Sequence, residues 1–379
     1  MKTREVVQGT KDYLPDEASL KRNIEDRTVQ TFLQWGYREV ITPTFEYLEV
    51  IEAGAGEGIR EELFLLQDRE GRLLALRPEM TIPIARMVST RMVEEEGPFR
   101  LFYNANIFRH TQTQIGRYKE FYQLGVELID APGPRADAEV IALAAEILAS
   151  EGVDFQISLN HIGFFNSLLE QSGLIERDKD EVKKLVAKKD MVGLEKKLAV
   201  LPLDDSFREI LMKIPVLHGG PEVLETLATE KKIPGVEIAL KEFTEVYSLL
   251  KCYGIENRIV VDLGVLRGFD YYTGVVFEGY SPDLGYPLLG GGRYDRLLGN
   301  FGRARAATGF AIGIERMMLA LKGRADKPQS SLLVSGSDLK AVLAKARDLR
   351  QEGHVVEVDL SPEQGEQTLQ VRPLEGGRS

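Results

Sequence analysis

Two long strand-like segments in the first third of the chain, separated by a short polar loop, restrict the possible fold more than any other feature. They cover residues 99–108 (FRLFYNANIF) and 117–129 (RYKEFYQLGVELI), and the loop between them reads RHTQTQIG. The second segment alternates, so that Tyr122 and Leu124 share one face and Gln123 lies on the opposite face. Strands joined by so short a connection are expected to pair in antiparallel fashion.

The rest of the chain has strands in hairpins and helices in blocks. Residues 63–79 predict a second hairpin around the turn DREG. Helices are expected at 16–35, 81–95, 135–151 and, without a clear strand, throughout 161–255; further strands are expected at 37–45, 153–159, 258–263, 272–280 and 285–289. A small strand–helix–strand unit with a polar tail follows at 331–335, 338–352 and 354–359. This order predicts an α+β fold with helices flanking a mostly antiparallel sheet, and it excludes a doubly wound sheet, which needs strict alternation of strand and helix.

Length, composition and charge define the broad class of protein. A chain of 379 residues favours two or three domains, and 43% hydrophobic with 28% charged residues is ordinary for a soluble globular protein. The sequence has no apolar run of membrane-spanning length, no apolar leader near its first residue and only one cysteine, Cys252, which together predict a cytoplasmic protein without a membrane contact. A net charge of −11 argues against a nucleic-acid surface.

Several common catalytic chemistries find no support. The chain lacks a phosphate-binding loop, a dinucleotide-binding glycine pattern and a nucleophile elbow. Its four histidines are scattered and none has the spacing of a metal site. We therefore expect neither a metal nor a cofactor.

Polar residues with no obvious structural use lie first in LRPEMT, residues 76–81, and around the long strand pair. Glu79 and Thr81 fall where a strand passes into a helix, so helix capping would also explain them. Gln123 and Glu127 are four residues apart on one face of a strand, and a buried Glu127 needs a partner, which a salt bridge to Arg109 would supply.

Two later segments add to this set. LRGFDYYTGVVFEG, residues 266–279, begins as a strand that carries Arg267, Tyr271 and Tyr272, and GGGRYD…GFAIGIER ends in Glu315 and Arg316. The three glycines at 290–292 suit either a tight turn or a close approach of the backbone to a flat ligand. Carboxylates and hydroxyls beside arginines suit a zwitterion, so the residues by themselves predict an amino-acid-binding pocket on an antiparallel sheet.

The order of these motifs resembles that of histidyl-tRNA synthetases, which are class II enzymes. GTKDYLPDE near the start, YREVITPTF with Pro43 as motif 1, LRPEMT, FRHTQTQIGRYKEFYQLGVELI as motif 2, LRGFDYYTGVVFE, and GFAIGIERMML as motif 3 all match in sequence and order over about residues 8–322. The resemblance implies a class II synthetase-like fold, a histidine-binding domain at 1–323 with a helical insertion at about 161–255, and a small C-terminal α/β domain with tail at 324–379.

The resemblance also implies a role for each pocket residue. Glu79, Thr81 and Gln123 would hold the α-amino group of histidine, and Arg267 with Arg109 would face its carboxylate. Glu127 and Tyr272 would contact the imidazole, with Tyr271 in support. Arg117 and Arg316 would be the remnant of a nucleotide site.

Two departures from the synthetase pattern matter. Thr111 replaces the glutamate expected to read adenine, and only 63 residues follow Arg316, about half of what an anticodon-binding domain needs. With LFYNANIFR and LRPEMTIPIAR, these departures resemble the synthetase paralogues that serve as regulatory subunits of ATP phosphoribosyltransferase. That resemblance implies a non-catalytic subunit that binds histidine as effector, forms a homodimer through residues 37–52, and joins the short-form catalytic subunit in a hetero-octamer.

Two other hypotheses remain open from the sequence. An active histidyl-tRNA synthetase with a reduced C-terminal domain is favoured by the retained Arg109, Arg267 and Arg316. A free-standing amidating or aminoacylating enzyme on the same fold has no sequence feature in its favour. Histidine-dependent ATP–pyrophosphate exchange, tested beside binding to the short phosphoribosyltransferase, separates these possibilities.

Overall fold

The computed structural model describes residues 5–110, 118–229, 235–265, 271–321, 331–360 and 368–374. Contacts within the chain divide it into two compact units, Met1–Lys322 and Gly323–Ser379. Each unit has its own sheet and its own hydrophobic core. We describe them separately.

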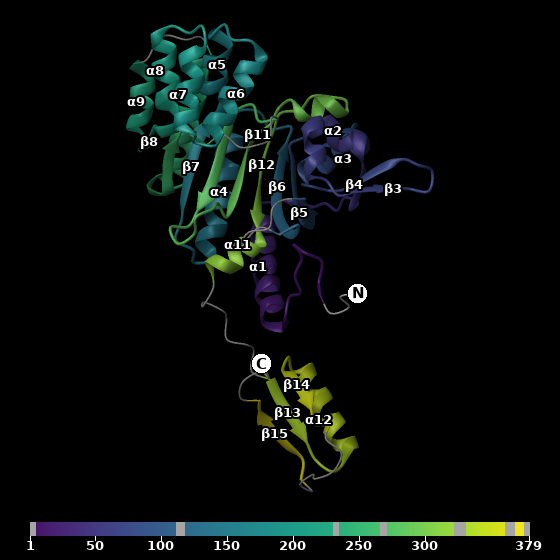
Figure 1. Ribbon diagram of the computed structural model, residues 1–379. Helices are drawn as coiled ribbons and strands as arrows, with labels where there is room; N and C mark the ends of the chain where they lie inside the picture. The colour runs from purple at the N-terminus through teal and green to yellow at the C-terminus, as the bar shows by residue number, and fades with distance from the viewer. Residues whose placement is uncertain are drawn as a thin grey trace. The chain divides into compact units, whose positions relative to one another are not determined.

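The larger unit is built on a nine-stranded sheet with the order β1-β5-β6-β12-β11-β10-β7-β9-β8 (Figure 1). The predicted antiparallel pair β5 (Phe99–Phe108) and β6 (Glu120–Ile129) lies near the β1 edge of this sheet. The other strands are β1 (Arg38–Glu39), β7 (Gln156–His161), β8 (His218–Gly219), β9 (Ile259–Asp262), β10 (Val275–Tyr280), β11 (Leu289–Arg293) and β12 (Ala307–Gly313). Pairing is antiparallel except for β1 with β5 and β7 with β9. The predicted α+β class with a mostly antiparallel sheet is therefore confirmed.

Helices cover both faces of this sheet. Leu124, Val126 and Leu128 of β6 point into a core shared with α1 (Pro15–Gln34), α4 (Pro134–Ser150), α10 (Val236–Cys252) and α11 (Ile314–Ala320). The opposite face packs against α2 (Leu48–Ala55), α3 (Thr81–Arg91) and the 3-10 turn η4 (Leu297–Phe301). Because side chains alternate along a strand, Gln123 and Glu127 face this second layer.

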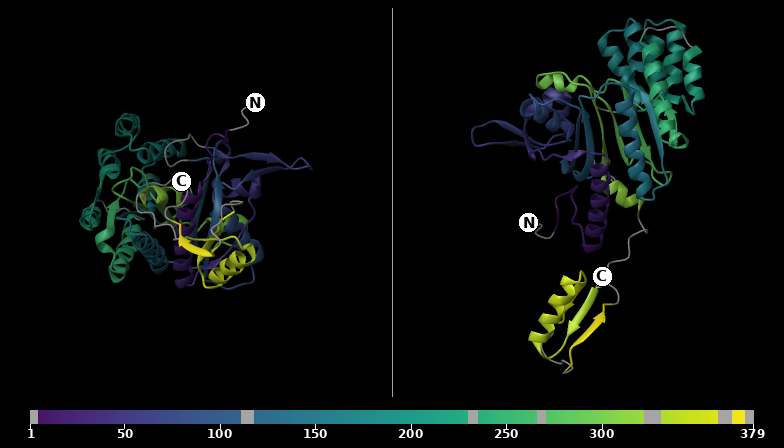
Figure 2. Two further views of the ribbon diagram at one scale, coloured as in Figure 1. Left: turned by 90° about the horizontal axis from the view of Figure 1, so that it is seen from below. Right: turned by 180° about the vertical axis from the view of Figure 1, so that it is seen from behind.

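A small three-stranded sheet extends from the second layer. β2 (Phe45–Tyr47), β4 (Leu73–Leu76) and β3 (Leu65–Gln67) pair in the order β2-β4-β3, and the 3-10 turn η1 (Glu57–Glu62) lies between α2 and β3 in the chain. The turn between β3 and β4 is closed by Asp68, whose carboxylate accepts the backbone amides of Glu70 and Arg72. The predicted hairpin at 63–79 is thus present, and it projects from the body in both Figure 1 and Figure 2.

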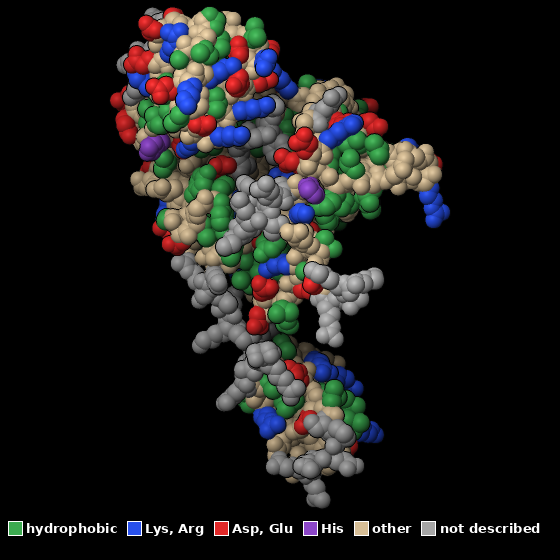
Figure 3. All heavy atoms as spheres, in the orientation of Figure 1, with side chains coloured by type: hydrophobic (Ala, Val, Ile, Leu, Met, Phe, Trp, Pro, Cys, Tyr) green, Lys and Arg blue, Asp and Glu red, His purple; other side chains and the backbone are tan. Residues whose placement is uncertain are grey.

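The segment expected to be helical, 161–255, forms a group of helices at one end of the large sheet (Figure 2). These are α5 (Ile162–Gln171), α6 (Glu176–Ala187), α7 (Met191–Val200), α8 (Asp205–Lys213), the 3-10 turn η2 (Ile214–Val216), α9 (Glu222–Thr229) and α10, and the turn η3 (Glu256–Arg258) follows. The two-residue strand β8 also lies here and was not expected, because two residues carry no alternation to detect. Acidic and basic side chains are interspersed over this group in Figure 3, as on a solvated surface.

The smaller unit contains β13 (Ser331–Ser335), α12 (Leu339–Gln351), β14 (Val355–Val358) and β15 (Gln370–Pro373). β13 pairs in parallel with β14 and antiparallel with β15. Its core is small: Val334, Val342, Ala346, Leu349 and Val356. The predicted strand–helix–strand unit is present, and β15 is an additional strand in what the sequence suggested was a polar tail.

The expected strand at 285–289 is wrong in position, because the strand is β11, Leu289–Arg293, and includes all three glycines. The glycines are required by neighbouring strands rather than by a turn. A Cβ on Gly291 would lie 2.0 Å from the carbonyl oxygen of Gly309. Side chains at these positions would therefore force the strands apart.

Candidate functional site

The carboxylate of Glu127 is the centre of the candidate site. It is 2% exposed and projects from β6 toward the N-terminus of α3. Thr81 Oγ1, at the first residue of α3, donates to Glu127 Oε1 at 2.7 Å, and the Tyr294 hydroxyl donates to Glu127 Oε2. Burial raises the pKa of Glu127 to about 8, although the hydrogen bonds from Tyr294 and Thr81 act in the opposite direction.

Glu79 is a second buried carboxylate beside the first, at 4% exposure. Its Oε1 accepts the backbone amide of Ile82 at 2.6 Å, and the Tyr271 hydroxyl lies 3.3 Å from Oε2. The capping role considered from the sequence is therefore real, but Glu79 also faces the pocket through its other oxygen. Burial raises its pKa, while the Ile82 amide and the charge of Arg109 lower it.

Glycines in the strands leave room for the polar groups of the site. Gly309 of β12 pairs directly with Glu127, and a Cβ at Gly309 would lie 2.2 Å from Glu127 Oε2. Gly125 makes room in the same way for the hydroxyl of buried Tyr103, which would lie 2.4 Å from an added Cβ. The absence of side chains at Gly309 and Gly125 thus leaves room for the Glu127 carboxylate and the Tyr103 hydroxyl.

Arginines lie beside the acidic centre. Arg109 Nε donates to the carbonyl oxygen of Pro78 at 2.6 Å, which places its charge next to Glu79. Arg77 is buried and donates to the carbonyl oxygens of Thr42 and Asn106, so it serves to fix the β4–α3 connection. The site therefore combines two buried carboxyl groups with a guanidinium beside Glu79.

The structure brings together Glu79, Thr81, Glu127, Tyr271 and Arg109 of the predicted residues. Tyr272 joins them through its ring, 5.0 Å from that of Tyr271. Gln123 is half-buried on the same face as Glu127, roughly 13 Å away along the strand.

One described residue of the predicted set, Arg316, has its printed contacts elsewhere. Arg316 Nη1 donates to the Pro287 carbonyl oxygen at 2.5 Å, and its guanidinium lies 5.5 Å from the centre of the Tyr286 ring. Arg117 and Arg267 lie outside the described residues, as does Thr111.

Tyr294 is the pocket residue that the sequence reasoning missed. It is 2% exposed, and its ring meets that of Tyr271 edge-on at 5.8 Å. Burial and the neighbouring Glu127 raise its pKa well above its usual range, so its hydroxyl keeps the proton that it donates. The sequence signal for Tyr294 was its place in GGGRYD, directly after the glycine run and Arg293.

Known proteins resemble this chain over nearly its whole length. The family model for histidyl-tRNA synthetase matches residues 9–317. The ATP phosphoribosyltransferase regulatory subunit of Moorella thermoacetica is 44% identical over 93% of this chain and 91% of its own, and that of Desulfitobacterium hafniense is 41% identical over 96% and 94%. The chain belongs to the ATP phosphoribosyltransferase regulatory subunit family.

Solved structures agree with this assignment. A Bacillus halodurans protein described as ATP phosphoribosyltransferase regulatory subunit/histidyl-tRNA synthetase superposes with a TM-score of 0.86 at 34% identity, covering 94% of this chain and 92% of that one. Histidyl-tRNA synthetase from Nostoc, at 22% identity and a TM-score of 0.81, shares the fold. The predicted resemblance is confirmed, and the regulatory subunit family shares its class II architecture with the synthetases.

A cleft of about 480 Å³ lies on the outer side of the tyrosines. Tyr271 and Tyr272 form one wall. Glu52 comes from α2, Arg296 directly precedes η4, and Lys183 comes from the helical insertion. Tyr271 and Tyr272, the tyrosine wall, therefore line this cleft, and the Tyr271 hydroxyl also lies 3.3 Å from the buried Glu79.

The chemistry that the site offers is recognition of a cation or a hydrogen-bond donor. Two buried carboxylates with raised pKa values gain most from a ligand that restores their charge by pairing with it. Within the part of the chain that the structure describes, there is no cluster of three or more potential metal ligands. The helices described there are also too short or too polar to span a bilayer.

Proposed function

We propose that this chain is the non-catalytic regulatory subunit of ATP phosphoribosyltransferase in histidine biosynthesis, and that it mediates feedback regulation by histidine. The observation that carries the proposal is the paired acidic pocket of Glu79 and Glu127 in a chain 44% identical to a regulatory subunit over 93% of its length. The unit Met1–Lys322 would bind histidine, and the smaller unit would be a truncated relative of the synthetase C-terminal domain. The chain would act in the cytoplasm.

Histidine would lie across the pocket with its imidazole at Glu127. Tyr294, Tyr271 and Tyr272 would surround the ring, and Glu79 and Thr81 with Gln123 would hold the α-amino group. Arg109 lies where a carboxylate would complete the zwitterion, and Arg267 is proposed to help it. A ring nitrogen that donates to Glu127 gives selectivity, because an apolar side chain would leave this buried carboxylate without its partner.

The partner would be the short-form catalytic subunit, assembled with a homodimer of this chain as core into a hetero-octamer. Histidine would bias this assembly between two arrangements. Such coupling is typically about 1–3 kcal/mol and must be reciprocal, so that the catalytic subunit changes histidine affinity by the factor by which histidine changes binding to the catalytic subunit.

Calorimetry with histidine, with and without the short catalytic subunit, tests the proposal. We expect selective binding of histidine over leucine, and a different affinity once the partner is present. Glu127→Ala is expected to weaken histidine binding by about 2–4 kcal/mol, because a ring nitrogen loses its partner. Equal affinity for leucine, or equal titrations with and without partner, would contradict the proposal.

An active histidyl-tRNA synthetase is the second candidate, favoured by the family model that spans residues 9–317 and by the placement of Arg109 beside Glu79. It predicts histidine-dependent exchange of pyrophosphate into ATP by the chain alone. A regulatory subunit binds histidine without this exchange. The same protein sample therefore decides between the two.

A further inference from the structure

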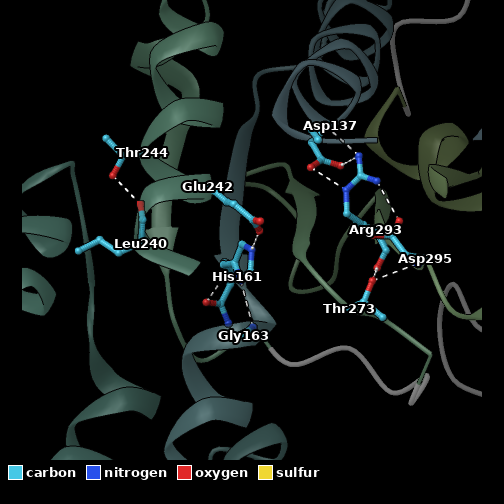
Figure 4. A network of polar contacts seen from close by, with 11 residues as sticks. Asp137, His161, Gly163, Leu240, Glu242, Thr244, Thr273, Arg293 and Asp295 are labelled. Carbon is cyan, nitrogen blue, oxygen red and sulfur yellow. Dashed lines mark hydrogen bonds and ion pairs between the residues drawn. The ribbon is translucent and has the colours of Figure 1, made fainter. Parts of the chain in front are cut away.

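A buried arginine with many contacts joins the pocket to the rest of the fold. The guanidinium of Arg293, at the end of β11, forms a two-point contact with Asp137 in the first turn of α4: Nε lies 2.9 Å from Oδ2, and Nη2 lies 2.9 Å from Oδ1 (Figure 4). Both side chains are less than 10% exposed. Arg293 also contacts Asp295 Oδ1 at 2.9 Å and the Gly133 carbonyl oxygen at 3.0 Å.

The backbone of Arg293 holds the tyrosine wall. Its carbonyl oxygen accepts the amide of Thr273 at 2.8 Å, directly after Tyr271 and Tyr272. Thr273 Oγ1 accepts the amide of Asp295 at 3.0 Å, which is a second hydrogen bond between Thr273 and the segment at the end of β11. The wall is therefore tied to the strand end that Arg293 fixes.

Tyr294 follows Arg293 in the chain and reaches Glu127 with its hydroxyl. Because the Arg293 guanidinium fixes the strand end against α4, it determines where the next side chain begins. Tyr294, which contacts Glu127, and Tyr272, which directly precedes Thr273, are thus both connected to Arg293. Gly274 completes the fit, since a Cβ there would lie 2.9 Å from Arg293 Cδ.

Residues 271–274, which include the tyrosine wall, are also held by a contact that does not involve Arg293. The carbonyl oxygen of Gly274 accepts the amide of Ile162 at 2.9 Å, and His161 beside it contacts Glu242 of α10 through Nε2 at 3.0 Å (Figure 4). The segment that contains the tyrosine wall is therefore hydrogen-bonded at two places, to Arg293 and to Ile162. Of these two residues, Arg293 is the one that directly precedes Tyr294 in the chain.

We propose that Arg293 is the positioning residue of the effector pocket, which sets the tyrosine wall and the Tyr294 hydroxyl against Glu127 through its paired contact with Asp137. This inference rests on the proposed binding of histidine. Lysine cannot replace Arg293, because a single ammonium lacks the planar fork that contacts a carboxylate at two points and a carbonyl oxygen at a third.

Arg305 provides a matched control. It is equally buried, contacts Asp130 Oδ2 at 2.9 Å, and donates to the carbonyl oxygens of Val93 and Glu95 at 3.3 and 3.2 Å. Asp130 directly follows the last residue of β6, and Asp130, Val93 and Glu95 are not pocket residues. Replacing Arg305 removes an ion pair in which the arginine is 4% exposed and the aspartate 35% exposed, and it leaves the Arg293–Asp137 contact in place.

The experiment compares Arg293→Gln, Arg293→Lys and Asp137→Asn with Arg305→Gln in the full chain. Hydrogen exchange without histidine is measured in peptides covering 271–280, and histidine affinity is measured by calorimetry. Arg293→Gln should speed exchange at 271–280 and weaken histidine binding about tenfold or more, Asp137→Asn less, and Arg293→Lys should not restore wild-type affinity. Arg305→Gln should lower the urea midpoint while histidine affinity stays within about twofold of wild type.

Each outcome decides the proposal. Wild-type protection and affinity in Arg293→Gln would overturn it, and so would an equal loss of affinity in Arg305→Gln, which would show a general effect of destabilisation. If Arg293→Gln does not fold, Asp137→Asn with unchanged protection and affinity overturns it. If wild-type protein fails to bind histidine, the proposed function is wrong, while the exchange at 271–280 still shows whether Arg293 positions the wall.

Discussion

Buried charged side chains in this protein are accommodated in two different ways. Most buried charges, such as Arg293 with Asp137, are paired, as the cost of desolvation demands. Glu127 instead receives hydroxyls from Thr81 and Tyr294, which satisfy its oxygens without neutralising its charge. Because this carboxyl group is buried without a cationic partner, its protonated form is favoured until a suitable ligand binds. Glu127 is therefore a candidate for sensing a ligand rather than a structural residue.

Replacing Glu127 with glutamine should therefore stabilise the ligand-free protein, and more so at higher pH. The folded pKa of about 8 lies above the ordinary 4.5, so the folded state holds a proton that the unfolded state releases. Wild-type stability then falls as pH rises from 4.5 to 8, whereas the glutamine variant lacks this loss. Urea unfolding at pH 5, 6, 7 and 8 should show a growing advantage of a few kcal/mol for Glu127→Gln. An advantage independent of pH would contradict the assignment.

Gly309→Ala tests the room left for the Glu127 carboxylate. The new methyl group would lie where the Glu127 carboxylate now lies, so the carboxylate must move away from Tyr294. We expect histidine affinity to fall about tenfold or more, with a loss of stability of about 1–3 kcal/mol from overpacking. Gly299→Ala is the control, because an added Cβ there meets atoms no closer than 3.6 Å. Calorimetry and urea unfolding of both variants give the comparison.

At the scale of elements, the sheet and the helical insertion meet at one helix start. His161 ends β7 and caps α5, since its Nδ1 accepts the amide of Gly163 at 3.1 Å. Its other nitrogen contacts Glu242 of α10, and the bond with His161 lowers the pKa of that carboxyl. One side chain thus joins a strand, the first helix of the insertion and its last helix.

His161→Ala should loosen this junction. The variant loses a helix cap and a buried hydrogen bond, which together amount to about 1–3 kcal/mol of unfolding free energy. Glu242→Gln keeps an oxygen that can accept from His161 Nε2 and should lose less. Because the lowered pKa of Glu242 gives stability that is present at neutral pH and lost on acidification, the difference between Glu242→Gln and wild type should shrink at low pH. Urea unfolding at pH 7 and pH 4 measures both effects.

At the scale of the whole molecule, the unexplained feature is an apolar face on the small sheet. Phe45 and Tyr47 of β2 and Leu66 of β3 are all more than 40% exposed, and they pair across the strands with Leu74 and Leu76 of β4. Hydrophobic side chains gather in the same region in Figure 3. Phe45 and Tyr47 belong to residues 37–52, the segment proposed to form the homodimer.

Phe45→Asp should therefore yield a monomer. In an isologous interface the same residue occurs on both subunits, so each dimer would bury two aspartates in an apolar contact. The free-energy cost of the substitution to dimerisation is therefore doubled. Light scattering at micromolar concentration should show a dimer for the wild type and a monomer for the variant. Val200→Asp, at a site 78% exposed on the insertion, is the control and should remain dimeric. A monomeric wild type would refute the proposed homodimer.

Local patterns in the sequence determined the elements and much of the pocket. The alternation in 117–129 placed Gln123 and Glu127 on one face, because successive strand side chains point to opposite sides whatever the rest of the chain does. The strand-to-helix passage at LRPEMT likewise placed Glu79 and Thr81 at a helix start, where α3 begins at Thr81. Both inferences need only neighbouring residues.

Only the tertiary structure decided which of these groups meet. Tyr294 and Glu127 are 167 positions apart, and Arg293 and Asp137 are 156 apart, so no local period relates them. The glycine run suited either a tight turn or a close approach of the backbone, and only the structure shows that neighbouring strands restrict it, β12 at Gly291 and the segment of β10 at Gly292. Side-chain spacing along one element fixes which face a residue takes, but contacts between elements depend on strand order and register, which arise when the whole sheet packs.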